Sequence, residues 1–99
     1  MKKMLGKKVI VRAKNAGVFY GVLESKEGNE VVLTNARKLW YWDGACAVEE
    51  LAVSGTLKPN NCKFTVKIKS TGIIGVTQIL PTTKNAQKSI EGVKPWKRG

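Results

Sequence analysis

Residues 8–34 read KVIVRAKNAGVFYGVLESKEGNEVVLT, and the fold class is most evident in this part of the sequence. The residue types that favour strands are dense in three segments, 8–14, 18–24 and 30–34. Turn-forming residues separate these segments, with Gly17 in the first gap and Gly28 in the second. The pattern therefore predicts three antiparallel strands joined as a β-meander.

Alternation within 18–24 places Tyr20 and Phe19 on opposite faces of the second strand. Gly21 interrupts this strand with a residue that has no side chain to pack. A glycine in such a position indicates a bulge or the close approach of another backbone.

Two short helices are expected after the meander. Residues 45–53 have apolar side chains at helical spacing, and Asp43 precedes them as a candidate cap. A second helix is predicted to run to Glu91 after a cap at Thr82 or Thr83.

Strict alternation of apolar and polar residues over 62–69 predicts a half-buried strand whose outer face is cationic. A turn is expected at Thr71-Gly72, followed by a last strand over 75–80 that Pro81 ends. The fold class is therefore α+β, with about five antiparallel strands in a curled sheet or small barrel and two short helices.

A chain of 99 residues suits a single domain spanning 1–99. Its N-terminal segment, 1–7, is basic, and 93–99 is a C-terminal tail in which Trp96 can dock.

The charge of the chain is strongly positive, with 18 Lys and Arg against 7 Asp and Glu, or formally +11. Residues 51–90 contain no carboxylate, and 2–14 contain six cations. Such a charge favours a polyanion or a phosphorylated small molecule as partner. The alternative is a basic domain whose charge serves only solubility.

The residue types for several kinds of catalysis are missing. The chain has no histidine, which excludes a Ser-His-Asp or Cys-His site and any His-ligated metal. Cys46 and Cys62 form no CxxC pair, so we expect no metal site and no cofactor. Both thiols should stay free, because we expect the protein in a reducing cytoplasm. Glu49 and Glu50 are adjacent on a helix, so their carboxylates diverge. No apolar run approaches the ~20 residues that cross a membrane. We therefore expect a binding protein without enzymatic activity.

The stretch ARKLWYW at 36–42 places three aromatic residues beside two cations. If it is extended, Lys38, Trp40 and Trp42 share one face, and Arg37, Leu39 and Tyr41 share the other. Aromatic rings stack on nucleobases, while Arg and Lys neutralise phosphates. Equally, Trp40 and Trp42 can be core residues. The candidate nucleotide-binding residues are Arg12, Tyr20, Arg37, Lys38, Trp40, Tyr41, Trp42, Lys67 and Lys69.

The same stretch, with VIVR at 9–12, AGVFYG at 16–21, EVVL at 30–33, CKF at 62–64 and KSI at 88–90, resembles a family of small bacteriophage proteins. The resemblance runs from about residue 8 to residue 96, and its hallmark is Ala-Arg-basic-apolar-Trp-X-Trp. It implies a phage protein that acts in the cytoplasm of the infected bacterium.

That family is in turn similar to phage proteins that sequester cyclic nucleotides in anti-CBASS immune evasion. This similarity implies a homo-oligomer that binds an anionic nucleotide, a cyclic dinucleotide above all, without cleaving it. Three other functions stay open: binding of single-stranded DNA or RNA, inhibition of a host protein, and an enzymatic activity.

Overall fold

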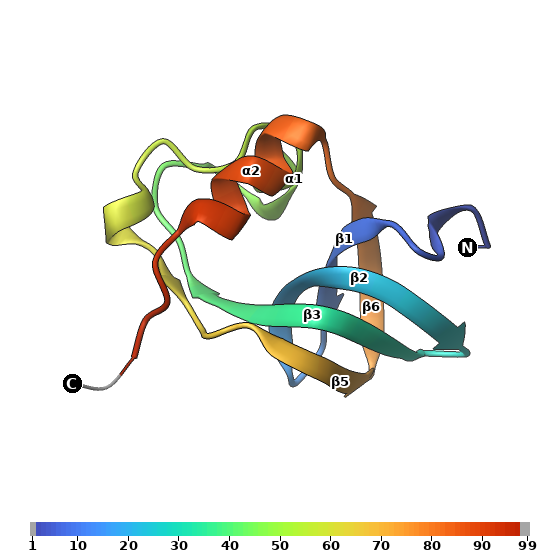
Figure 1. The fold of residues 1–99 in the computed structure, drawn as a ribbon. Coiled ribbons are helices and arrows are strands. Elements are labelled where there is room, and N and C mark those ends of the chain that lie inside the picture. The colour runs from blue at the N-terminus through green and yellow to red at the C-terminus, as the bar shows by residue number, and fades with distance from the viewer. Residues whose placement is uncertain (1, 98–99) are drawn as a thin grey trace.

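The computed structural model describes residues 2–97 and has an α+β fold (Figure 1). Within these residues, six antiparallel strands form one open, curled sheet, and two α-helices lie together over one part of it. The strands are β1 (Lys8–Ala13), β2 (Gly17–Glu27), β3 (Glu30–Tyr41), β4 (Lys63–Phe64), β5 (Ile68–Ile74) and β6 (Val76–Pro81). The helices are α1 (Val48–Ser54) and α2 (Lys84–Gly92), and two 3-10 helices, η1 (Lys2–Met4) and η2 (Pro59–Asn61), complete the elements.

The long strand β3 organises the sheet because two strands share one of its edges. The order is β4–β3–β2–β1–β6, and β5 also pairs with β3. β4 lies against the C-terminal half of β3, where Leu39 is opposite Phe64. β5 lies against the N-terminal half, where Val31 is opposite Ile73.

The predicted meander is confirmed, but β2 and β3 are longer than the sequence indicates. The extension of β3 has a long-range cause. Arg37 lies opposite Tyr20 and Lys38 lies opposite Phe19 of β2, while β4 pairs with Leu39 and Tyr41.

The predicted close approach at Gly21 is also confirmed. The pairing of β2 with β3 shifts register between Tyr20 and Val22, where β3 carries an extra residue. Asn35 adopts a positive φ of 49° at this point. A Cβ atom built on Gly21 would lie only 3.0 Å from the carbonyl oxygen of Thr34 and 3.1 Å from the Cβ of Ala36.

The prediction of one strand over 62–69 is wrong. The chain pairs with β3 at Lys63–Phe64, leaves the sheet, and pairs again from Ile68. At the break, Thr65 still bonds to Lys38 of β3, whose backbone N–H donates to the Thr65 hydroxyl at 2.8 Å. Cys62 and Phe64 are therefore buried as alternation predicts, whereas Val66 and Ile68 are exposed.

The turn predicted at Thr71-Gly72 is wrong as well. Gly72 lies within β5, opposite Val32, because β3 is long enough to pair with the whole strand. The chain turns instead at Gly75, which has a positive φ of 81° and donates its N–H to the carbonyl of Asn29.

Both predicted helices are present, but only α2 has a side-chain cap at its start. α1 begins at Val48 after Ala47, which offers no side-chain cap, so the expected cap at Asp43 is wrong. α2 is confirmed, and the Thr83 side chain accepts the N–H of Ala86 at its start.

The sheet packs apolar side chains on both faces, in two clusters. One lies between the sheet and the helices and contains Ile10, Tyr20, Leu39, Val48, Leu51, Ala52, Cys62, Phe64, Leu80, Ala86, Ile90 and Val93. The other lies on the opposite, inner face of the curl and contains Val9, Val11, Ala13, Leu23, Val31, Leu33, Ala36 and Ile73. Helix α2 thus closes one end of the molecule above the C-terminal half of β3. Among the described residues, no helix is long and apolar enough to cross a membrane.

Candidate aromatic and cationic surface

Two exposed tryptophans from distant parts of the chain stack at one end of the molecule. Trp40 belongs to β3, and Trp96 belongs to the tail that follows α2. Their ring centroids lie 4.9 Å apart with an interplanar angle of 21°. Trp40 is 54% exposed and Trp96 is 45% exposed, so the pair presents a large aromatic surface to solvent.

A lysine completes this pair. The Nζ of Lys63 lies 5.2 Å from the Trp40 ring centroid and 5.3 Å from that of Trp96, within the range of a cation–π interaction. Two contacts hold Lys63 there. β4 pairs with β3, and the backbone N–H of Trp96 donates to the carbonyl of Phe64 at 2.8 Å. We call Trp40, Trp96 and Lys63 the indole platform.

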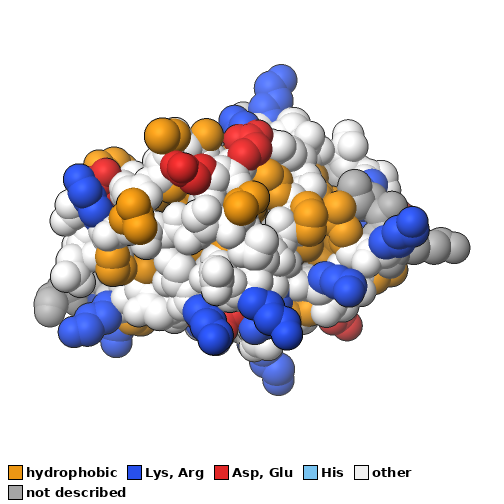
Figure 2. Space-filling model, turned by 90° about the horizontal axis from the view of Figure 1, so that it is seen from above, with side chains coloured by type: hydrophobic (Ala, Val, Ile, Leu, Met, Phe, Trp, Pro, Cys, Tyr) orange, Lys and Arg blue, Asp and Glu red, His pale blue; other side chains and the backbone are white. Residues whose placement is uncertain are grey.

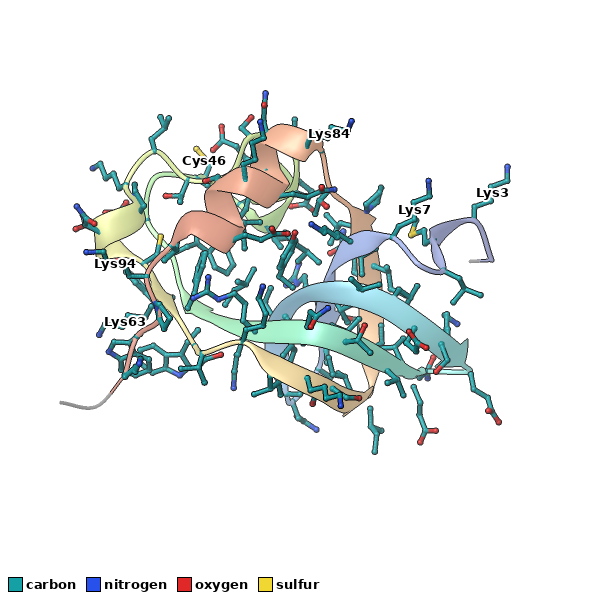
Figure 3. The ribbon with its side chains drawn as sticks, viewed as in Figure 1. Lys3, Lys7, Cys46, Lys63, Lys84 and Lys94 are labelled. Carbon is teal, nitrogen blue, oxygen red and sulfur yellow. The ribbon has the colours of Figure 1, made fainter. Side chains whose placement is uncertain are left out.

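Further cations lie around the indole platform. Lys94 and Lys97 flank Trp96 in the tail and are exposed, and Figure 3 shows Lys63 and Lys94 at the same end of the molecule. Lys38 is half-buried on the strand that carries Trp40, with its Nζ 5.8 Å from the Phe19 ring centroid. Aromatic rings beside several ammonium groups suit a ligand that carries bases and phosphates.

The sequence missed two members of the platform, Lys63 and Trp96. Lys63 looked like one cation on the outer face of a longer strand. Trp96 was recognised only as a residue that can dock. The signal that could have found it is the tail sequence KPWK at 94–97, which repeats the aromatic and cationic composition of 37–42.

Arg37 is not available to a ligand, which corrects the prediction that it binds phosphate. Only 5% of it is exposed, and its guanidinium donates to four backbone carbonyls. These belong to Phe64, Thr65, Ile90 and Val93, at distances from 2.8 to 3.2 Å. Burial lowers its pKa from the usual value. Arg37 therefore joins β3 to the chain after β4 and to the end of α2.

Tyr20 is also buried, which corrects its assignment as a ligand-stacking residue. Its hydroxyl donates to Glu91 at 2.5 Å, and Lys8 Nζ lies 2.8 Å from the same carboxylate oxygen. Burial raises the pKa of Tyr20, and the bond to Glu91 raises it further. Burial also opposes ionisation of Glu91, but hydrogen bonds from Lys8 and Tyr20 outweigh it and lower the carboxyl pKa.

The structure does bring three predicted residues together, away from the platform. Tyr20, Arg37 and Lys67 line a cavity of about 90 Å³, together with Lys8 and Glu91. Tyr20, Lys8 and Glu91 bond to one another and Arg37 bonds to backbone carbonyls, so four of these five groups are already paired.

The other predicted site residues lie apart from one another. Arg12 bonds to Gln78 of β6 at 3.4 Å, and Lys69 is exposed on β5. Tyr41 is half-exposed at the end of β3. Trp42 is partly buried against the core cluster beneath the helices, so the core interpretation is confirmed for Trp42 but is wrong for Trp40.

In the helix-side view, Lys and Arg side chains lie mostly around the rim, with fewer acidic groups among them (Figure 2).

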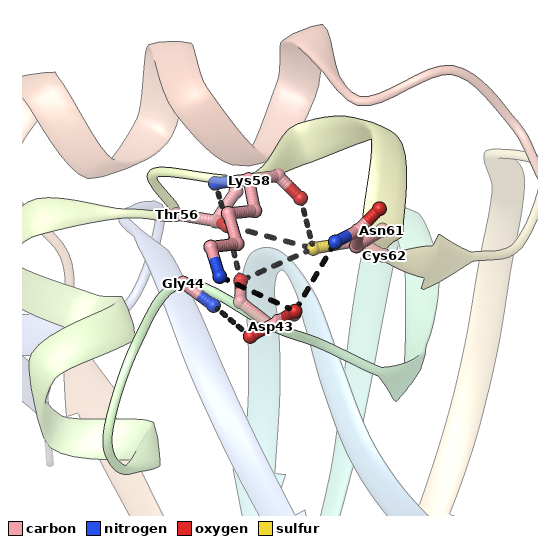
Figure 4. Close-up of polar contacts among 6 residues, drawn as sticks. All are labelled: Asp43, Gly44, Thr56, Lys58, Asn61 and Cys62. Carbon is pink, nitrogen blue, oxygen red and sulfur yellow. Dashed lines mark hydrogen bonds and ion pairs between the residues drawn. The ribbon is translucent and has the colours of Figure 1, made fainter.

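A polar cluster around Asp43 holds the loop between β3 and α1 (Figure 4). The Asp43 carboxylate accepts from the Gly44 N–H at 2.8 Å and the Asn61 amide at 3.2 Å. The bond from Asn61 is the largest cause of a lowered Asp43 pKa. The Thr56 hydroxyl donates to the Asp43 carbonyl, and the buried Cys62 thiol lies 3.6 Å from that hydroxyl. This is structural bracing: among the described residues, no three Cys, Asp or Glu side chains are grouped to hold a metal ion.

Residues 6–90 match a family model described as a domain of unknown function, DUF6948. The chain belongs to this family. No curated protein matches it. The matched range includes all six strands, and with them Trp40 and Lys63 of the platform, whereas Trp96 lies beyond it. The family match therefore covers the scaffold of the platform but not the tail that completes it.

Proposed function

We propose that this protein binds a nucleotide-containing anion without cleaving it, and that the indole platform is where it binds. The observation that carries the proposal is the exposure of two stacked indoles beside Lys63, at an end of the molecule that also has Lys94 and Lys97. A contiguous exposed apolar surface is a common mark of a binding site.

Single-stranded DNA or RNA is the ligand that this geometry supports best. The platform is an open surface, and proteins that bind single strands combine such aromatic surfaces with cations that follow the backbone. Each stacked base contributes ~1–3 kcal/mol.

A cyclic dinucleotide is the second candidate, as part of the phage immune-evasion role that the sequence resemblance implies in the host cytoplasm. The observation that favours it is the 4.9 Å separation of the two ring centroids, which lets one compact ligand touch both indoles. Tight capture of so small a ligand requires enclosure, since small-molecule sites bury most of the ligand surface.

One titration decides between these ligands and tests the platform. Oligothymidine and a cyclic dinucleotide are titrated by calorimetry into the wild type and into Trp40→Ala, Trp96→Ala and Lys63→Ala. We expect each tryptophan variant to lose about tenfold or more in affinity for the preferred ligand. Binding to the oligonucleotide should also weaken with salt, with a log–log slope of ~0.7 for each neutralised phosphate.

Tyr41→Ala is the matched control, because Tyr41 is a half-exposed aromatic residue of the same strand that does not belong to the indole platform. Circular dichroism establishes that each variant is folded. If Tyr41→Ala weakens binding and Trp40→Ala does not, the ligand does not bind at the platform. Recovery of intact ligand after long incubation is expected, and cleaved products would contradict a binding role.

A further inference from the structure

One edge of β5 has no partner strand among the described residues. β5 pairs with β3 on one side only. The chain turns at Gly75 directly into β6, which pairs with β1 as the other edge strand of the sheet (Figure 1). A free strand edge presents unpaired N–H and C=O groups and is a template for pairing with another chain.

This edge also exposes apolar side chains. Ile68 is 45% exposed at the start of β5, and Ile74 is 71% exposed at its end. Natural edge strands are usually blunted by charges, prolines or bulges. Within β5 the only charged residue is Lys69, and the strand contains no proline.

The sequence of β5 is complementary to itself in one antiparallel register. If a two-fold axis passes through Thr71, Ile68 of one copy lies opposite Ile74 of the other. Ser70 then lies opposite Gly72, and Lys69 lies opposite Ile73. The two exposed isoleucines pair at both ends, and no like charges meet directly.

The charges at the two ends of β5 also complement each other. Lys67 and Lys69 lie at the start of the strand, while Glu30 lies opposite Ile74 at its end, with Glu27 nearby in the hairpin. Antiparallel pairing brings the basic start of one strand to the acidic end of the other. This arrangement offsets locally the repulsion between two chains of net charge +11.

A hollow beside Ile74 provides a place for the side chain that the second copy would bring. This cavity, of about 320 Å³, is lined largely by apolar residues of β3 and β5, including Val32 and Ile73. In the register centred on Thr71, Ile68 of the second copy lies on the same face as Ile74, at the border of this hollow.

We propose that the free edge of β5 is a homodimer interface, in which two copies pair antiparallel about Thr71 and continue one sheet across both molecules. The proposal rests on the strand edge and is independent of what the indole platform binds. By the same symmetry, the two platforms lie on one face of the joined sheet, at its opposite ends.

The first experiment measures molecular mass across a concentration series by sedimentation equilibrium, at about 0.15 M salt, where the Debye length is about 8 Å. The full chain should show a monomer–dimer equilibrium. Ile74→Lys should raise the dissociation constant at least about tenfold, because it replaces an apolar contact with Ile68 of the second copy by a charged side chain that pairing would take out of water. Leu57→Lys is the matched control, since Leu57 is an exposed apolar residue in a loop away from β5. A monomer at all concentrations, or a dimer equally weakened by both substitutions, would overturn the proposal.

The second experiment tests the register. In a Cys46→Ser background, which removes the exposed native thiol, Thr71→Cys places a cysteine on the two-fold axis. Residues directly opposite in an antiparallel pair have Cα atoms about 4.5–5.5 Å apart, within the range of a disulfide. Thr71→Cys should therefore form a disulfide-linked dimer under mild oxidation much faster than Thr77→Cys, which lies exposed on β6. Equal rates for the two variants would show that β5 does not pair in this way.

Discussion

At the scale of single residues, Arg37 shows how a charged side chain can serve the fold. Its guanidinium donates to carbonyls of Ile90 and Val93 at the end of α2, where the helix dipole favours a cation. It also donates to Phe64 and Thr65 and lies 5.5 Å from the Phe64 ring centroid. One of the charges that suggested a polyanion ligand is therefore used inside the molecule.

Replacing Arg37 should destabilise the protein strongly. Arg37→Ala removes the side chain that donates to the carbonyls of Val93 and Thr65, and each unsatisfied buried group costs about 1–3 kcal/mol. We expect the free energy of unfolding in urea to fall by about 3 kcal/mol or more. Lys69→Ala, which removes an exposed cation of a neighbouring strand, should change it by less than about 0.5 kcal/mol. A similar small change for Arg37→Ala would contradict the bracing role.

At the scale of elements, the close pairing of β2 with β3 depends on Gly21. The extra residue in β3 brings the Ala36 backbone against Gly21, with its Cα 3.1 Å from the position a Cβ would occupy. The irregularity lies between β3 and β2 only, since β5 pairs with β3 in regular register from Glu30 to Ala36. The small size of Gly21 thus permits the close approach of these two strands.

Gly21→Ala and Gly72→Ala should therefore have opposite effects. At Gly21 the new methyl group meets backbone atoms that cannot rotate away, and overpacking of this kind costs about 1–3 kcal/mol. At Gly72, where nothing lies within 4 Å, the same substitution restricts the unfolded chain and should be neutral or stabilise slightly. Urea denaturation in dilute solution measures the free energy of unfolding of the two variants. Equal destabilisation by both would show that Gly21 is not tightly enclosed.

At the scale of the whole molecule, Glu91 links α2 to the sheet. Its carboxylate accepts from Lys8 of β1 and from Tyr20 of β2, two neighbouring strands. The helix layer and the sheet are thereby joined by a group whose charge depends on pH. Its pKa in the folded protein is lowered, against the opposing effect of burial, by these two partners.

This linkage predicts a loss of stability in acid. A carboxyl group with a lowered pKa in the folded state stabilises the protein above its unfolded pKa of about 4.3, and the contribution disappears as the pH falls through the folded value. Thermal melting between about pH 6 and pH 3 should therefore show a decline that is shallower in Glu91→Gln. Glu24→Gln, which changes an exposed residue of β2, should keep the slope of the wild type. Parallel curves for the wild type and Glu91→Gln would contradict the linkage.

The strongest sequence expectations were those that depend on neighbours in the chain. Strand propensity and glycine turns predicted the meander, the missing side chain at Gly21 indicated a bulge or a close approach, and a cap at Thr82 or Thr83 marked the start of α2. These features follow from sterics and periodicity within a few residues, so they can be recognised without knowing the rest of the fold. The net charge of +11 also follows from the sequence alone. The positions of the charged side chains in the folded molecule do not.

Other features depend on residues far apart in the chain, and only the tertiary structure decided them. Arg37 is buried because α2 brings the carbonyls of Ile90 and Val93 to it from more than fifty residues away. Trp40 is paired because the tail returns Trp96 to β4. The segment 62–69 is divided because each half of β3 has a different partner. Local periodicity contains no information about these partners, since long-range contacts select among conformations that the local sequence permits about equally.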